Sequence, residues 1–166
     1  NNTGFVNLGT SHDTSEFAVE SISRWWDTVG KHTFPNSKRI YITCDSGGSN
    51  GCRVKMWKYQ LQEFANHTGL EIEISHFPRG TSKWNKVEHR LFCYITQNWK
   101  GKTIVDIQTA VDLIGSTKTT TGLEVICVRD DNEYRLAKKV SDEDFESIAI
   151  NKIKPFELWN YRIIPN

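Results

Sequence analysis

The chain has 166 residues, of which 37% are hydrophobic and 25% are charged, and its net charge is only +1. This composition excludes a disordered chain, and the length suits one domain with a buried core, so we take residues 1–166 as a single domain. Without a global positive charge, any nucleic acid must be held by a local basic patch. No apolar run approaches transmembrane length and the first residues do not resemble a signal peptide, so we expect a cytoplasmic protein with no membrane partner.

The opening segment, residues 1–9 (NNTGFVNLG), contains a short strand over residues 4–9 and reads like a strand entered from upstream. We therefore expect the chain to be a piece of a longer protein. A helix follows to about Val29, with Asp13 placed as its N-terminal cap and Glu16 three residues later, which is the spacing of a capping box.

The next strand, residues 39–45 (RIYITCD), runs directly into a loop that contains three glycines. Alternation along this strand puts Ile40, Ile42 and Cys44 on one face and Asp45 on the other. A second helix is predicted over residues 52–66, with Gly69 as its stop signal. Its inner face comprises Val54, Trp57, Leu61 and Phe64.

Residues 70–74 (LEIEI) alternate cleanly, which predicts a strand with one solvated face near a sheet edge. A loop then leads to a third helix over residues 84–99. Strand and helix have now alternated three times, a pattern that predicts an α/β fold with parallel crossovers.

The last third is less regular. Residues 105–116 predict a helix, and residues 122–128 and 133–140 predict two strands joined by a turn over residues 129–132. A short helix follows, with Ser141 or Asp142 as its cap.

Two acids occupy positions that suit a metal site. Asp45 ends a strand, where ligands of α/β sheets gather, and the adjacent glycines let a ligand approach the backbone. Glu88 lies one turn into the helix after the neighbouring strand, so the two carboxylates can share a divalent ion such as Mg²⁺. Taken singly, an Asp before Gly-Gly is more often a turn former, and a Glu early in a helix is more often a helix-dipole partner.

Basic residues surround Glu88 in the sequence, although a solvated face is the commoner role of such a run. The candidates for contact with DNA phosphates are Lys83, Lys86, His89 and Arg90. Trp84 can stack on an extruded base, but its fit to the inner face of the helix favours a core position. We expect His76 to be solvated or to cap a helix. The core tryptophans are Trp25, Trp26, Trp57 and Trp99.

The cysteines match neither a C-x-x-C pair nor a zinc-binding spacing, so we expect reduced thiols, most of them buried. They are Cys44, Cys52, Cys93 and Cys127. Nucleophilic catalysis by a Cys-His pair has little support, because only Cys52 lies in a glycine-rich basic turn and it fits a helix start.

Two segments are specific enough to indicate a family: residues 44–65 (CDSGGSNGCRVKMWKYQLQEFA) and residues 76–99 (HFPRGTSKWNKVEHRLFCYITQNW). They closely resemble the catalytic core of Rhodopirellula-type transposases of bacterial insertion sequences, which belong to the Asp-Asp-Glu (DDE) group. Flanking segments such as HDTSEFAVESISRWW and WNYRI resemble the same family, so the resemblance covers nearly the whole chain.

This resemblance implies an α/β fold of the ribonuclease H-like type, a mixed sheet flanked by helices, without its first strands. It implies that Asp45 is the second catalytic acid and Glu88 the third, and that both are metal ligands. The family's first acid lies on an early strand, upstream of residue 1. Asp13 does not replace that acid, because Asp13 follows a strand and sits at a helix cap. With two of three ligands, the chain alone is expected to be inactive.

The implied function is metal-dependent cleavage and transfer of DNA strands, with Mg²⁺ or Mn²⁺ as cofactor and two ions in the complete site. The implied partners are double-stranded DNA, as transposon ends and target, and further copies of the chain in a homo-oligomer. Two alternatives stay open. One is a non-catalytic DNA-binding or assembly module of the same fold, and the other is a hydrolytic ribonuclease H-like nuclease that uses water in place of a DNA 3′-hydroxyl.

Overall fold

A computed structural model describes residues 2–166, and the chain divides into two compact units. The small unit comprises residues 2–11 and 83–133, and the large unit comprises residues 12–82 and 134–166. The prediction that residues 1–166 form a single domain stays a prediction.

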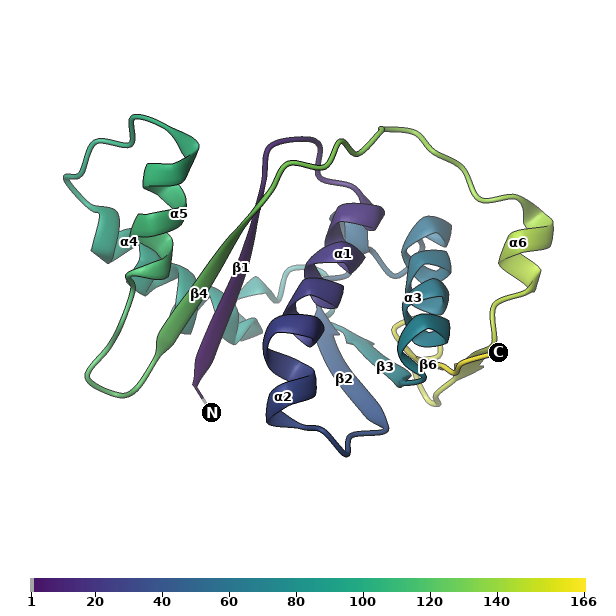
Figure 1. Cartoon of the computed structure of the whole chain (residues 1–166). Coiled ribbons are helices and arrows are strands. Elements are labelled where there is room, and N and C mark those ends of the chain that lie inside the picture. Colours follow the sequence, from purple (N-terminus) through teal and green to yellow (C-terminus); the bar gives the residue numbers. More distant parts are fainter. Residues whose placement is uncertain (1) are drawn as a thin grey trace. The chain divides into compact units, whose positions relative to one another are not determined.

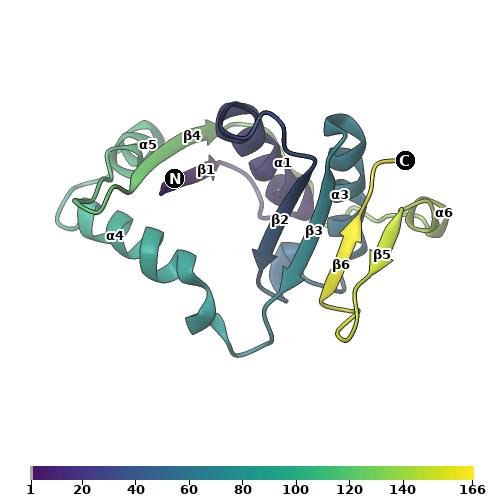
Figure 2. The same ribbon diagram turned by 90° about the horizontal axis from the view of Figure 1, so that it is seen from below.

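The large unit is built on a four-stranded mixed sheet with the strand order β2-β3-β6-β5, which is seen clearly in Figure 2. Its strands are β2 (Arg39–Cys44), β3 (Glu71–His76), β5 (Ile150–Lys152) and β6 (Asn160–Ile163). Strands β2 and β3 are parallel, with Cys44 opposite His76, and β6 is antiparallel to both β3 and β5. The carboxyl ends of β2 and β3 therefore lie together at one end of the sheet.

Helices α1 and α3 lie side by side on one face of this sheet (Figures 1 and 2). The helices of the large unit are α1 (Ser15–Trp25), α2 (Lys31–Thr33), α3 (Lys55–Thr68) and α6 (Asp142–Glu146). A π-helical turn, Trp26–Gly30, joins α1 to α2 without a break. The core between helices and sheet includes Trp57, Leu61, Ile72, Ile74, Tyr161 and Ile163.

The other face of the sheet carries polar side chains. Glu71 and Glu73 of β3 project from it, and they form ion pairs with Arg39 of β2 and Arg162 of β6. The predicted solvated face of β3 is therefore correct, but its predicted place near an edge is wrong. β3 lies between β2 and β6, and the cross-strand ion pairs let its glutamates sit in the middle of the sheet.

The small unit pairs two parallel strands, β1 (Thr3–Gly9) and β4 (Glu124–Asp130). Its helices are α4 (Cys93–Trp99), which continues a π-helical turn over Glu88–Phe92, and α5 (Ile107–Gly115). A 3₁₀ turn over Ser82–Trp84 precedes them. The buried core of this unit consists of Ile95, Ile114, Leu123 and Val125.

The α/β prediction, with a mixed sheet flanked by helices, is confirmed. The strand predicted over residues 133–140 is wrong, because this segment is a loop in which Ala137 has a φ of 60°. Instead of pairing in a hairpin, the loop is tied to the start of α1. Tyr134 packs edge-to-face on Phe17 with ring centroids 5.4 Å apart, and Lys138 forms an ion pair with Glu16 at 2.6 Å.

The structure also tests the predictions for the tryptophans, the cysteines and a membrane-spanning helix. Trp84 is 53% exposed, so its predicted core position is wrong, whereas Trp57 is fully buried as predicted. All four cysteines are free, but only Cys44 and Cys52 are buried. Within residues 2–166, no helix combines the length and apolarity that a membrane crossing requires.

Candidate functional site

Asp45 immediately follows β2, and its side chain is exposed. Within the described residues, no hydrogen bond or ion pair reaches its carboxylate. The side chain borders an open hollow whose other lining residues are Ser46, Gly47, Pro78, Arg79 and Gly80. A carboxylate free of protein partners, beside an exposed arginine, is available to a cation and to an anionic ligand of that cation.

The glycine-rich loop after Asp45 is shaped by its backbone. Gly48 has a φ of 72°, a left-handed conformation that glycine adopts without strain. A Cβ on Gly51 would lie 3.2 Å from the carbonyl oxygens of both Ser46 and Gly48, so a side chain there would crowd the turn. The loop is therefore a tight turn that a larger residue at position 48 or 51 would disturb.

Asp13, just before α1, and Ser15, the first residue of α1, both contact this loop at Ser49. The Ser49 hydroxyl donates a hydrogen bond to Asp13 Oδ1 at 2.8 Å, and the Ser15 hydroxyl donates to the Ser49 carbonyl oxygen. The cap of α1 is Thr14, whose Oγ1 accepts from the Phe17 N–H at 3.2 Å, so the prediction of Asp13 as the cap is wrong. Asp13 instead accepts the hydrogen bond from Ser49 and so helps to hold the glycine-rich loop in place.

His76, at the end of β3, lies beneath Asp45 and is only 5% exposed. The expectation of a solvated or capping histidine is wrong. Its Nδ1 is 2.9 Å from the Asp45 carbonyl oxygen, and its Nε2 is 2.9 Å from the Tyr161 hydroxyl. The signal was present in the sequence, because His76 follows Ile72 and Ile74 at strand spacing and so points into the core.

Burial controls the ionisation of this end of the sheet. It lowers the pKa of His76, an effect that the hydrogen bond to the Asp45 backbone opposes and nearby Lys58 reinforces. It also raises the pKa of Cys44 to about 12, with the Asp45 charge adding to the rise. The neutral histidine and neutral thiol are therefore the forms present near pH 7.

Glu88 stands in the small unit, in the first turn of the helical segment that begins at Lys86. Asn85 caps that segment, since its Oδ1 accepts from the Val87 N–H at 3.3 Å. The Asn-x-x-Glu spacing thus sets an exposed carboxylate three residues beyond a capping residue, where the helix dipole favours negative charge. Sequence reasoning did not identify this capping role of Asn85.

The four predicted DNA contacts lie around Glu88 on the same segment and all are exposed: Lys83, Lys86, His89 and Arg90. In the described part of the chain, none of them forms an ion pair. Trp84 and Val87, also exposed, interleave with them. Their role in DNA binding stays a prediction.

Asp45 belongs to the large unit and Glu88 to the small unit, so a metal ion shared between them stays a prediction. Residues 2–166 contain no group of three or more His, Cys, Asp or Glu side chains placed to hold a metal. The two exposed carboxylates nevertheless suit Mg²⁺ by their chemistry, because this ion usually takes one or two protein carboxylates and completes its shell with water and phosphate.

The family model of the Rhodopirellula transposase DDE domain matches residues 1–165. The chain belongs to this family. No curated protein and no solved structure matches it. Membership of the DDE transposase domain family supports a transposase-type function and an enzyme of the nucleotidyl-transfer class, and the α/β fold with its mixed sheet agrees with the ribonuclease H-like fold of such domains.

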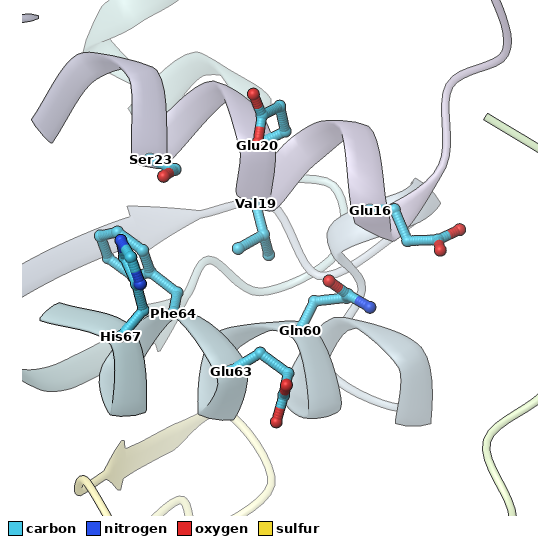
Figure 3. A pocket seen from close by; sticks show the side chains of 8 residues that line it. All are labelled: Glu16, Val19, Glu20, Ser23, Gln60, Glu63, Phe64 and His67. Atoms are coloured by element: carbon cyan, nitrogen blue, oxygen red, sulfur yellow. The ribbon is translucent and has the colours of Figure 1, made fainter. Parts of the chain in front are cut away.

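A second hollow of the transposase domain lies between α1 and α3 (Figure 3). It is lined by Glu16, Val19, Glu20, Ser23, Gln60, Glu63, Phe64 and His67. Glu16 is paired with Lys138, and Glu20 with Arg24 at 2.7 Å, so two of its three carboxylates already have cationic partners. The hollow at Asp45 is therefore the candidate site.

Proposed function

We propose that this domain catalyses metal-dependent cleavage and transfer of DNA strands, with Asp45 and Glu88 as ligands of Mg²⁺ or Mn²⁺. The supporting observation is the Asp45 carboxylate, which is exposed and unpaired among the described residues at the carboxyl end of β2, in a chain that belongs to a DDE transposase family. A bound divalent ion supplies Lewis-acid stabilisation of the charge that develops on the phosphoryl oxygens.

The chain's own residues bind and orient the reactants. Asp45 and Glu88 contribute oxygen ligands of the type that hard cations prefer. Arg79, exposed beside Asp45, is placed to neutralise a phosphate that enters the hollow. Lys83, Lys86, His89 and Arg90 form the surface that we assign to the DNA backbone, and Trp84, exposed among them, offers a ring on which a base can stack.

The test uses the protein that carries this domain and labelled transposon-end DNA, and it scores strand cleavage and strand joining separately. Asp45→Asn keeps the side-chain shape but removes the anionic ligand, so we expect both reactions to fall by at least about 100-fold. Asp27→Asn is the matched control, because Asp27 is an exposed aspartate whose partner is Lys31 on the same helical segment.

The outcomes separate the three functions. Cleavage and joining that both depend on Asp45 support the transposase. Cleavage without joining identifies a hydrolytic nuclease, and DNA binding without either reaction identifies an assembly module. Unchanged joining in the Asp45→Asn protein would contradict the role of this carboxylate.

A further inference from the structure

We infer that His76 is a positioning residue for Asp45: its neutral side chain, protonated on Nδ1, donates to the Asp45 carbonyl oxygen and fixes the backbone from which the carboxylate projects. The functional meaning of this contact rests on the proposed role of Asp45 as a metal ligand. The contact itself does not depend on that role.

The backbone at the end of β2 is held at three successive carbonyl groups. The Cys44 carbonyl oxygen accepts from the Phe77 N–H at 2.8 Å, and the Ser46 carbonyl oxygen accepts from the Cys52 N–H at 3.4 Å. Between them, the Asp45 carbonyl oxygen accepts from His76 Nδ1 at 2.9 Å. Only this middle bond, at the candidate ligand itself, is made by a side chain, so only it can be removed by substitution.

The direction of the hydrogen-bond chain through His76 is fixed by its two ends. The Asp45 carbonyl can only accept, so Nδ1 must carry a proton. The indole of Trp57 can only donate, and it donates to the Tyr161 oxygen at 3.0 Å. Among the described residues, the buried Tyr161 hydroxyl has no acceptor other than His76 Nε2, so it donates to Nε2, which accepts as a neutral imidazole does.

Burial makes this arrangement obligatory. Trp57 is 1% exposed and Tyr161 is 0% exposed, so water cannot replace a missing partner. A reversed chain would set the lone pair of Nδ1 against the Asp45 carbonyl oxygen. The Cys44 sulfur, 3.3 Å from Nδ1, is a second and weaker acceptor for the same proton and does not change the direction.

The fixed backbone matters because the loop beyond Asp45 is rich in glycine. Glycine segments lose more conformational entropy than others when they are ordered, so an unanchored Asp45 would present its carboxylate from a mobile segment. Partners that orient a metal ligand are worth about 10–100-fold in metal affinity in characterised sites. We expect an effect of that size from the His76 contact.

The first experiment measures the tautomer of His76 in the 166-residue chain by ¹⁵N NMR of the imidazole. We expect the form protonated on Nδ1 alone. Tyr161→Phe removes the donor to Nε2 but keeps the Asp45 carbonyl acceptor, so the proton is expected to stay on Nδ1 in this variant as well. A wild-type ring protonated on Nε2 and bare at Nδ1 would overturn the inference without any variant.

The second experiment compares His76→Asn with His76→Gln. The asparagine amide nitrogen lies near the place of Nδ1 and can keep the bond to Asp45, whereas the longer glutamine places its amide near Nε2. Loop amides over residues 45–51 are expected to keep order parameters of about 0.85 in wild type and His76→Asn, and these are expected to fall below about 0.6 in His76→Gln. Mn²⁺ affinity, followed by paramagnetic line broadening, is expected to drop about 10-fold in His76→Gln only.

Different results would contradict the positioning role of His76 and the metal-ligand role of Asp45. If the loop stays ordered and Mn²⁺ affinity is unchanged in His76→Gln, with a well-dispersed spectrum as proof of folding, His76 does not position Asp45. If His76→Gln loosens the loop but Asp45→Asn leaves Mn²⁺ binding unchanged, the positioning contact stands and the proposed metal-ligand role fails.

Discussion

Thr14 and Asp13 are neighbours with different tasks at the start of α1. Thr14 satisfies a backbone N–H of the first turn, and Asp13 accepts from Ser49 in the loop beyond Asp45. Sequence alone favoured the wrong one of the two, because Asp and Thr are both good caps and only the path of the chain decides which side chain faces the helix.

A pair of alanine substitutions separates these tasks. Thr14→Ala is expected to lower the free energy of unfolding by about 1 kcal/mol in urea titrations. Asp13→Ala, at an exposed hydrogen bond, is expected to lower it by less and to speed hydrogen exchange of the loop amides over residues 46–51. Equal losses of stability with unchanged loop exchange would show that Asp13 belongs to the cap.

His76 and Trp84 show where residue-level prediction failed. His76 is in phase with two buried isoleucines, and its position in the strand decides its burial although its side chain is polar. Trp84 fits the inner face of a helix that starts at residue 84, but the helix begins at Lys86 after the Asn85 cap, so the Trp84 ring precedes the helix and is exposed. Element boundaries of one or two residues are set by capping contacts, which periodicity does not contain.

At the scale of elements, hydrophobic periodicity predicts a helix or strand correctly where one face of the element is buried. It predicted the buried faces of β2 and α3 and the end of α3 at Gly69, whose φ of 71° is typical of a helix stop. It failed for residues 133–140, where alternation occurs without burial of either face. The parallel pairing of β4 with β1 is a long-range contact that no local pattern encodes.

The segment that carries Glu88 is the element we assign to DNA. Replacing Lys83, Lys86 and Arg90 together by alanine is expected to weaken DNA binding about equally for all sequences. The salt slope of log K is expected to fall by up to about 3, roughly 1 for each phosphate that is no longer neutralised. Fluorescence anisotropy over a range of salt concentrations measures both quantities.

The matched control removes the same charge from the large unit, through alanine at the exposed Lys139, Lys152 and Lys154. It is expected to leave the slope nearly unchanged. If both triple variants behave alike, the surface around Glu88 is a solvated face.

Strand β2 forms one end of the four-stranded sheet, and within the described residues only β3 pairs with it. Unpaired N–H and C=O groups on such an edge favour pairing with another chain. We predict that the 166-residue chain self-associates as its concentration rises, as measured by sedimentation velocity. Thr43→Lys on β2 should weaken the association, and Asn151→Lys on β5 should not. A monomer at all concentrations would contradict pairing through this edge.

At the scale of the whole molecule, the chain is two α/β units, each with its own core and each contributing one candidate acid. The family assignment and both acids were accessible from the sequence, because the motifs that carry them are short and local. A metal ion shared by Asp45 and Glu88 is a property of both units together, and it is the central claim of the proposed function.

The most direct test adds substoichiometric Mn²⁺ to the ¹⁵N-labelled chain and follows paramagnetic broadening of its amide signals. We predict that signals around Gly47 in the large unit and around His89 in the small unit broaden together, and that Asp45→Asn or Glu88→Gln alone abolishes both effects. Glu146→Gln, at an exposed glutamate, should change neither. Broadening confined to one unit, or broadening near Glu88 that survives Asp45→Asn, would contradict a shared metal ion.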